Sequence, residues 1–221
     1  MVKVIHQTWE TKDNLPKKFK KEWLDSWKQK NPGWEVKWWD CNDRRDLIKE
    51  YYPRYLSLFD GYNKNIHRAD VFRYFLLHKW GGLYADMDCE CLRPIDELFD
   101  NDITLGKGYI PAHGLGSVPS VALMYSIPGN SFWEFVFERL DFYDSITKKS
   151  EVMAKTGPLM LADRYLEYGD REKIKLLDSD IFIWDVSNVY VKTGYVSHHV
   201  SGTWGTFEDK PLPDIFKLEI L

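Results

Sequence analysis

The amino-acid sequence predicts an α/β fold, formed by 221 residues in one domain without an internal repeat. Short apolar segments of strand length alternate with segments of helical periodicity through the first half of the chain, which is the pattern of a sheet covered by helices. No linker or low-complexity stretch divides the chain, and its length suffices for a sizeable core. In such folds, ligands bind beside the carboxyl ends of the strands.

The N-terminal elements are separated by strong turn signals. Val2–Ile5 is a short apolar strand, and a loop precedes a helix over Lys17–Lys30. Asn31-Pro32-Gly33 ends this helix, and Trp34–Trp39 then has strand character. Two short helices are expected next, over Asp43–Glu50 and Tyr55–Phe59.

The clearest helix is predicted over Ile66–Trp80, because Gly81 and Gly82 follow it in the position that often adopts a positive φ. A buried strand over Leu83–Ala85 follows directly. The later elements are assigned from the same periodicities: strands at Ile103–Leu105, Val121–Ser126, Ile174–Leu177, Ile181–Trp184 and Tyr195–Val200, and helices at Phe132–Phe142 and Leu159–Tyr168.

The helix over Lys17–Lys30 combines tryptophans with lysines. Phe19, Trp23, Leu24 and Trp27 recur at helical spacing with lysines around them. A basic helix that carries tryptophan can lie on an anionic membrane. We interpret this one instead as a surface helix packed on its own core.

Composition limits the classes of function. A net charge of −4 gives no general attraction to nucleic acid. Cys41, Cys89 and Cys91 cannot all pair within the chain, so a reducing compartment is expected. No apolar run approaches the roughly 20 residues that span a bilayer, and the N-terminus lacks the pattern of a signal sequence. We therefore expect a cytoplasmic protein without a transmembrane segment, with peripheral membrane contact at most.

Asp86 and Asp88 are the strongest chemical signal, because they follow an apolar strand and stand one residue apart. In an extended segment alternate side chains share a face, so both carboxylates are expected to point the same way while Met87 points back. Two close carboxylates repel unless a cation is present. Mn²⁺ or Mg²⁺ prefers oxygen ligands and leaves positions for substrate phosphates. A solvated acidic turn is the alternative.

A second D-x-D segment, Asp178-Ser179-Asp180, serves as an internal comparison, and we interpret it as a polar turn. The first pair differs in what precedes it. Asp70 and Arg73 lie three positions apart on one face of the long helix, where alone they form an ion pair worth about 0.2–0.5 kcal/mol. A tight glycine turn would bring them alongside the acids, where they could bind sugar hydroxyls.

The third signal is the segment His198-His199-Val200-Ser201-Gly202-Thr203-Trp204. Histidine is a suitable third ligand for Mn²⁺, and Trp204 could close over a diphosphate through its indole N–H. Alternation along a strand makes only one of the two histidines point inward. A half-exposed strand histidine is the alternative for each.

Together these segments resemble the DXD glycosyltransferases of family thirty-two. That family includes yeast-type initiating α-mannosyltransferases and bacterial capsule and lipooligosaccharide sugar transferases, and it shares its donor site with the large clostridial glucosylating toxins. The resemblance implies a GT-A-like, Rossmann-like domain over residues 1–221, with a mixed central sheet flanked by helices. The segments that carry it are Ile5-His6-Gln7-Thr8-Trp9, Arg68-Ala69-Asp70 with Arg73, Trp80-Gly81-Gly82-Leu83-Tyr84, Asp86-Met87-Asp88, Thr156-Gly157-Pro158 and His198 to Trp204.

The resemblance implies a role for each matching donor-site residue. Trp9 would stack on the nucleotide base, and Tyr84 would line the nucleotide pocket. Asp70 and Arg73 would bind the donor sugar, and Trp204 would contact the diphosphate. Thr156-Gly157-Pro158 would shape the sugar or acceptor side.

The resemblance also implies a metal site for Mn²⁺ or Mg²⁺. Asp86 would contact the ribose or the metal, and Asp88 would ligate the metal. His199 is the predicted third ligand, with His198 as the alternative. Eukaryotic members carry an N-terminal membrane anchor, and this chain begins almost at the first motif, so residence in the Golgi is not expected.

The predicted function is a metal-dependent, retaining transfer of a hexose from a UDP- or GDP-hexose to a glycan, lipid-linked or protein hydroxyl. No nucleophile stands out, so direct front-face attack by the acceptor is the hypothesis. Two alternatives remain: a phosphatase that uses D-x-D as nucleophile and acid, and a non-catalytic nucleotide-sugar or carbohydrate-binding module, for which 16% aromatic residues suffice.

Overall fold

A six-stranded mixed sheet forms the centre of the structure, a computed structural model that describes residues 1–13, 15, 17, 19–108, 118–140, 151–184 and 194–201. The strand order is β2-β1-β3-β6-β5-β7. β1 is parallel to both of its neighbours, whereas β6 is antiparallel to both β3 and β5. The strands are β1 (Val4–Thr8), β2 (Glu35–Trp39), β3 (Gly82–Ala85), β5 (Ile103–Gly108), β6 (Val118–Ser126) and β7 (Ile174–Leu177).

A second, three-stranded sheet with the order β4-β9-β8 lies beside the first. It begins at β4 (Cys89–Cys91), only a few residues after β3, and continues through β9 (Val196–His198) to β8 (Phe182–Trp184). β4 and β9 are antiparallel, with Cys89 opposite His198. This pairing brings the segment after Asp88 next to the histidines near the end of the described chain.

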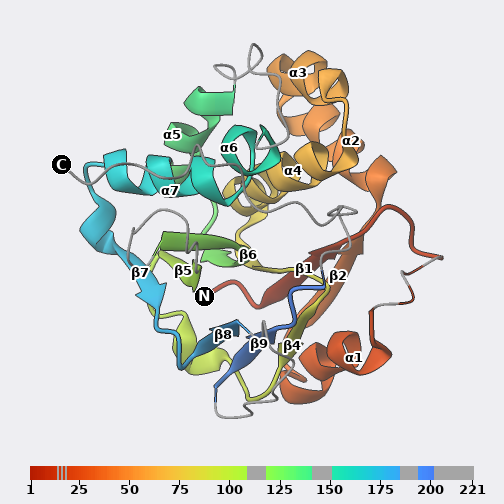
Figure 1. Ribbon diagram of the computed structural model, residues 1–221, viewed down its shortest axis with the longest axis vertical. Coiled ribbons are helices and arrows are strands. Elements are labelled where there is room, and N and C mark those ends of the chain that lie inside the picture. The colour runs from red at the N-terminus through yellow and green to blue at the C-terminus, as the bar shows by residue number, and fades with distance from the viewer. Residues whose placement is uncertain are drawn as a thin grey trace, which may run out of the picture.

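Helices cover the central sheet on one side, and the small sheet covers it on the other (Figure 1). The helical side contains α2 (Cys41–Tyr51), α3 (Leu56–Gly61), α4 (Asn65–Trp80), α5 (Ser131–Leu140), α6 (Glu151–Lys155) and α7 (Pro158–Glu167). α1 (Lys21–Lys30) lies by β4 on the opposite side. Single 3₁₀ turns occur at η1 (Pro53–Tyr55), η2 (Asp96–Leu98) and η4 (Arg171–Lys173).

The central helix α4 matches the predicted helix to within one residue at its start. It ends at Gly81, whose φ of 64° is left-handed, as the double glycine predicts. A side chain there would clash, because a Cβ would lie 2.7 Å from Cδ of Pro128. All residues from Ala69 to Leu77 are buried, so the helix is packed on most of its surface and not on one stripe alone.

The basic helix packs on the core, as we interpreted it. Trp27 is fully buried, and its indole N–H donates to the Cys89 carbonyl at 2.9 Å. The helix begins at Lys21 and not at Lys17, because Lys20 has extended backbone at the helix cap. The exposed positions of α1 are mainly polar, among them Lys21, Lys28 and Lys30.

Several other elements begin or end at residues that differ from the predicted ones, because long-range strand pairing or helix capping sets these ends. β1 extends to Thr8, because all five of its residues pair with β2. α2 begins at Cys41, because Asp40 caps it in a reciprocal arrangement with Asp43. β4 and α6 were not predicted, since each is short. Asp178-Ser179-Asp180 is a turn between β7 and β8, as expected.

The three cysteines are free thiols, with Cys41 exposed and the other two buried. Among the described residues, no helix combines the length and the apolar character that crossing a membrane requires. The extent of the domain over residues 1–221 stays a prediction.

Candidate active site

The D-x-D segment is a turn that joins the two sheets. Asp86 follows the last residue of β3, and the N–H of Cys89, the first residue of β4, donates to the Asp86 carbonyl at 2.9 Å. The expected extended segment is therefore wrong, because the chain reverses here to enter the small sheet. Asp86 stays at the end of the central sheet, and Asp88 faces the small sheet.

Asp86 is tied to the central sheet and to α4. Its Oδ1 accepts hydrogen bonds from the Tyr84 hydroxyl at 2.8 Å and from Nη1 of Arg73 at 3.2 Å. Its Oδ2 makes no hydrogen bond within the part of the chain that the structure describes. The side chain of Asp86 is 23% exposed, whereas that of Arg73 is 4% exposed. One carboxylate oxygen of Asp86 is thus available to an incoming ligand.

Arg73 connects the helix to the acids. It lies 2.9 Å from Oδ1 of Asp70 and donates to the Val121 carbonyl at 2.8 Å, and its guanidinium lies 4.7 Å from the centre of the Tyr84 ring. The Asp70–Arg73 pair is therefore no surface ion pair of the kind that contributes a few tenths of a kcal/mol. Breaking such a buried pair leaves an uncompensated charge.

Asp70 is a buried carboxyl with opposing influences on its charge. Burial is the largest influence and raises the pKa of Asp70 to about 7, aided by the charge of Asp86. Arg73 and a hydrogen bond from Thr156 act in the opposite direction and lower the pKa. The Thr156 hydroxyl donates to Oδ2 of Asp70 at 3.0 Å.

Asp88 is held by the last residue of β9 and by the segment that follows this strand. His198 Nε2 lies 3.2 Å from Oδ1, and Oδ2 accepts hydrogen bonds from both the N–H and the hydroxyl of Ser201 at 2.8 Å each. Burial opposes the ionisation of Asp88, but these three contacts hold its pKa well below its ordinary value. Burial alone would lower the pKa of His198, and the bond to Asp88 raises it.

The two histidines point to different partners. His198 faces Asp88, whereas the His199 ring stacks on Trp23 at 4.1 Å and its Nε2 lies 3.0 Å from Oε2 of Glu90. As expected from strand alternation, only one of the two histidines faces the acids. It is His198, the alternative to His199 in the sequence prediction. His199 contributes its main-chain N–H, which donates to the Asp88 carbonyl at 2.9 Å.

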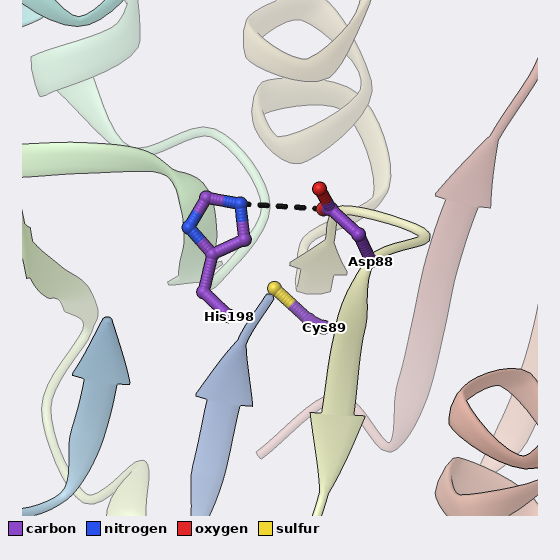
Figure 2. A group of neighbouring side chains, drawn as sticks. All are labelled: Asp88, Cys89 and His198. Carbon is purple, nitrogen blue, oxygen red and sulfur yellow. Dashed lines mark ion pairs between the residues drawn. The ribbon is translucent and has the colours of Figure 1, made fainter. Parts of the chain in front are cut away.

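Asp88, Cys89 and His198 form a group that could hold a metal ion, with one ligand atom from each within 4.8 Å of the others (Figure 2). Carboxylate oxygen suits both Mn²⁺ and Mg²⁺, whereas imidazole nitrogen is a ligand for transition-metal ions and suits Mn²⁺ better than Mg²⁺. Burial raises the pKa of the Cys89 thiol well above its ordinary value, so the sulfur stays protonated. The ionised or neutral donors that this group offers a dication are therefore the Asp88 carboxylate and the His198 imidazole.

Of the remaining predicted residues, Trp9 directly follows β1, and Tyr84 lies within β3. Trp9 continues the pairing of β1 with β2, since its N–H donates to the Trp39 carbonyl at 3.1 Å, and its ring meets the edge of Phe19 at 4.9 Å. Burial raises the pKa of Tyr84 well above its ordinary value, so its hydroxyl stays a donor. Trp204 lies outside the described residues.

The sequence did not predict the contacts of three supporting residues, His6, Thr156 and Ser201. His6 accepts a hydrogen bond from the Trp39 indole at 3.2 Å and donates to the Gly81 carbonyl at 3.0 Å, which holds the glycine turn. Burial lowers the pKa of His6 to about 4, so it is neutral. Thr156 and Ser201 bind the two aspartates from distant segments. The only signal was that each lies within a segment that resembles the family.

A separate cavity of about 560 Å³ lies on the helical side, lined by residues that include Tyr52, His78, Glu134 and Phe137. It contains none of the predicted site residues. We place the candidate site at the acids and not in this cavity, because the charged contacts converge at the acids.

Comparison with known proteins supports this assignment. Residues 17–104 match the protein family described as "Glycosyltransferase sugar-binding region containing DXD motif". Inositol phosphoceramide mannosyltransferase 3 of Schizosaccharomyces pombe is 41% identical over 99 residues, covering 43% of this chain and 26% of that protein. Mannosyl phosphorylinositol ceramide synthase SUR1 of Saccharomyces cerevisiae is 33% identical over 168 residues, covering 75% of this chain and 42% of that protein. The chain thus spans less than half the length of either relative.

The fold has solved counterparts among glycosyltransferases. The PaToxG glycosyltransferase superposes with a TM-score of 0.57 at 17% identity, covering 75% of this chain and 69% of that chain. At this identity the likeness concerns the fold, which is the GT-A-like arrangement of a mixed sheet flanked by helices. The matching family region contains α4, both glycines and both aspartates, and the structure brings these residues together. Residues 17–104 of the chain therefore correspond to the sugar-binding region of the DXD-containing glycosyltransferases.

Proposed function

We propose that the protein transfers a hexose from a nucleoside diphosphate sugar to a hydroxyl acceptor, with a divalent cation as cofactor. The observation that carries this proposal is the continuous chain of contacts from Asp70 through Arg73 to Asp86, beside the Asp88–His198 pair. A carboxylate and a guanidinium are groups that bind sugar hydroxyls. The contacts connect these two groups, on Asp70 and Arg73, with the residues that suit a metal ion.

Mn²⁺ or Mg²⁺ would be held by Asp86, Asp88 and one histidine. When bound, the ion supplies positive charge that neutralises the diphosphate leaving group. His198 is the histidine that the geometry favours, because its Nε2 already lies 3.2 Å from Asp88. His199, the sequence prediction, would need to leave Trp23 and Glu90 to reach the same place.

Asp70 and Arg73 orient the donor sugar in this proposal, and Trp9 with Tyr84 binds the nucleotide. The transferred carbon passes through an oxocarbenium-like state, as in glycoside hydrolysis. Resemblance to the family supports retention of configuration. Without an identified nucleophile, front-face attack by the acceptor is the hypothesis, and a fluorinated donor should leave no covalent sugar on the protein. A mass increase of one sugar residue would refute it.

The relatives indicate where to look first for specificity. One is named an inositol phosphoceramide mannosyltransferase and the other a mannosyl phosphorylinositol ceramide synthase, and these names make mannose the first sugar to test and a phosphoinositol lipid the first acceptor. A glycan or a protein hydroxyl remains the wider acceptor class. A cytoplasmic location with peripheral membrane contact remains a prediction.

A donor screen tests the proposal. Incubation with UDP- and GDP-hexoses should release the nucleoside diphosphate slowly without an acceptor and faster with one, in each case only with Mn²⁺ or Mg²⁺. Asp88→Ala should lower this rate about 100-fold or more. Asp180→Ala, in the second D-x-D segment, is the matched control and should keep the wild-type rate.

Two outcomes would contradict the proposal. Equal activity of Asp88→Ala and the wild type would remove the role of the D-x-D segment. Release of phosphate from simple monoesters, without use of any sugar donor, would favour a phosphatase instead.

A further inference from the structure

Asp70 uses its two carboxylate oxygens for two different partners. Oδ1 meets Arg73, one turn along the same helix, and Oδ2 meets the hydroxyl of Thr156, 86 positions away in sequence. Thr156 lies in the turn between α6 and α7 and is fully buried. A residue from a distant element therefore determines where the second oxygen of Asp70 lies.

The hydrogen bonds have a definite direction. A hydroxyl has one proton, and the Asp70 carboxylate only accepts once the pH exceeds its pKa of about 7, so Thr156 donates to Asp70 in that ionised state. The Nδ1 of His67 lies 2.9 Å from the same hydroxyl oxygen and must then be the donor. His67 is completely buried, and burial lowers its pKa to about 4, so the ring is neutral with its proton on Nδ1. The result is a relay from His67 through Thr156 to Asp70.

The main chain of the α6–α7 turn is attached to α4 as well. The Tyr74 hydroxyl donates to the Thr156 carbonyl at 2.7 Å. Gly157 lies so close that an added Cβ would stand 2.9 Å from the Val152 carbonyl and 3.4 Å from Oδ2 of Asp70. The turn is thus held from both the side chain and the main chain of Thr156.

We propose that Thr156 and His67 are positioning residues that hold the Asp70 carboxylate in the orientation that meets Arg73 and the donor sugar. This inference rests on the proposed function. Reactive geometry must be held to a fraction of an ångström, and an aspartate with one oxygen unbound has more than one accessible rotamer. Because both Oδ1 and Oδ2 are bound, the Asp70 side chain is restricted to a single rotamer.

Substitution of the hydroxyl tests the relay. Thr156→Val keeps the shape of the side chain and removes its donor, and we expect kcat for donor turnover to fall about 10- to 100-fold, with a smaller change in KM. Thr156→Ser keeps the hydroxyl and should stay within about threefold of the wild type. Thr104→Val is the matched control, because the Thr104 hydroxyl is buried yet makes no hydrogen bond within the described residues. It should also keep wild-type turnover.

A readout that does not depend on activity separates the relay from the proposed function. Nitrogen-15 NMR of the histidine side chains should find the His67 proton on Nδ1, and Thr156→Val should shift that resonance whereas Thr104→Val should not. If the wild type turned over no donor, the proposed function would fail while this NMR test of the relay still stood or fell by itself. A proton on Nε2 in the wild type would overturn the relay.

A second pair of variants covers the case in which Thr156→Val does not fold. His67→Asn retains an N–H that can reach the Thr156 hydroxyl, and His67→Leu does not. We expect turnover to be kept by the first and reduced by the second. Wild-type kcat in folded Thr156→Val, or equal kcat in the two His67 variants, would overturn the positioning role.

Discussion

The charge of Asp70 should make the stability of the protein depend on pH in a direction opposite to that of an ordinary surface aspartate. Asp70 is buried, and its pKa rises from 3.8 to about 7 although Arg73 lies 2.9 Å away. Between these two values the folded protein keeps a proton that the unfolded chain has released. The free energy of unfolding therefore falls as pH rises through this window.

The magnitude follows from the shift. At about 1.36 kcal/mol per pKa unit, the difference between the folded and unfolded values amounts to about 4 kcal/mol in full, of which about 2 kcal/mol falls between pH 5 and pH 7. Asp70→Asn removes this titration. As pH rises over that range, the free energy of unfolding of Asp70→Asn should therefore increase by about 2 kcal/mol relative to that of the wild type.

Urea unfolding of both proteins at several pH values measures this difference. Other titrating groups, such as His6 and His198, are common to both proteins and cancel in the comparison. Asp178→Asn is the control, because the side chain of Asp178 is 68% exposed, and we expect it to change stability by less than about 0.5 kcal/mol. A difference that stayed constant with pH would refute the reasoning. A difference of opposite slope would show that Arg73 outweighs burial.

Three further predictions concern the metal and the glycine turn. His198→Ala should weaken Mn²⁺ binding more than His199→Ala does, measured by titration calorimetry, because only His198 lies against Asp88; the reverse order would restore the sequence prediction. His6→Phe should cost about 1–3 kcal/mol in urea unfolding, since it leaves the partly buried Trp39 indole N–H and the buried Gly81 carbonyl without their hydrogen-bond partner. Gly81→Ala should lower the free energy of unfolding by about 1–3 kcal/mol in the same assay, because the added Cβ would contact backbone atoms at a residue with a left-handed φ. An unchanged urea midpoint would contradict this prediction.

Local patterns in the sequence were enough for the helix–turn–strand unit at the centre of the fold. Helical periodicity ends at Trp80, glycine alone suits the left-handed position at 81, and an apolar strand follows. Each of these preferences depends on a few neighbouring residues, so it can be read from the chain itself. The same unit carries Asp70, Arg73 and both acids, which explains why most of the candidate site was found.

Short elements whose stability comes from distant partners were missed. β4 has three residues and exists because it pairs with β9, more than one hundred positions later. Its presence turns the D-x-D segment from an extended strand into a reversal. No local signal in Cys89–Cys91 distinguishes these outcomes, because strand formation there depends on the partner.

The choice between His198 and His199 shows the limit of the sequence most clearly. Strand alternation establishes that one histidine faces the acids, but the register with β4 decides which one, and a slip of one residue would exchange them. Thr156 is a similar case, since its contact with Asp70 spans 86 positions. The sequence alone determined the local order of helix, glycine turn and acids, because near neighbours set it. Only tertiary structure decided register and long-range hydrogen bonds, because packing sets these.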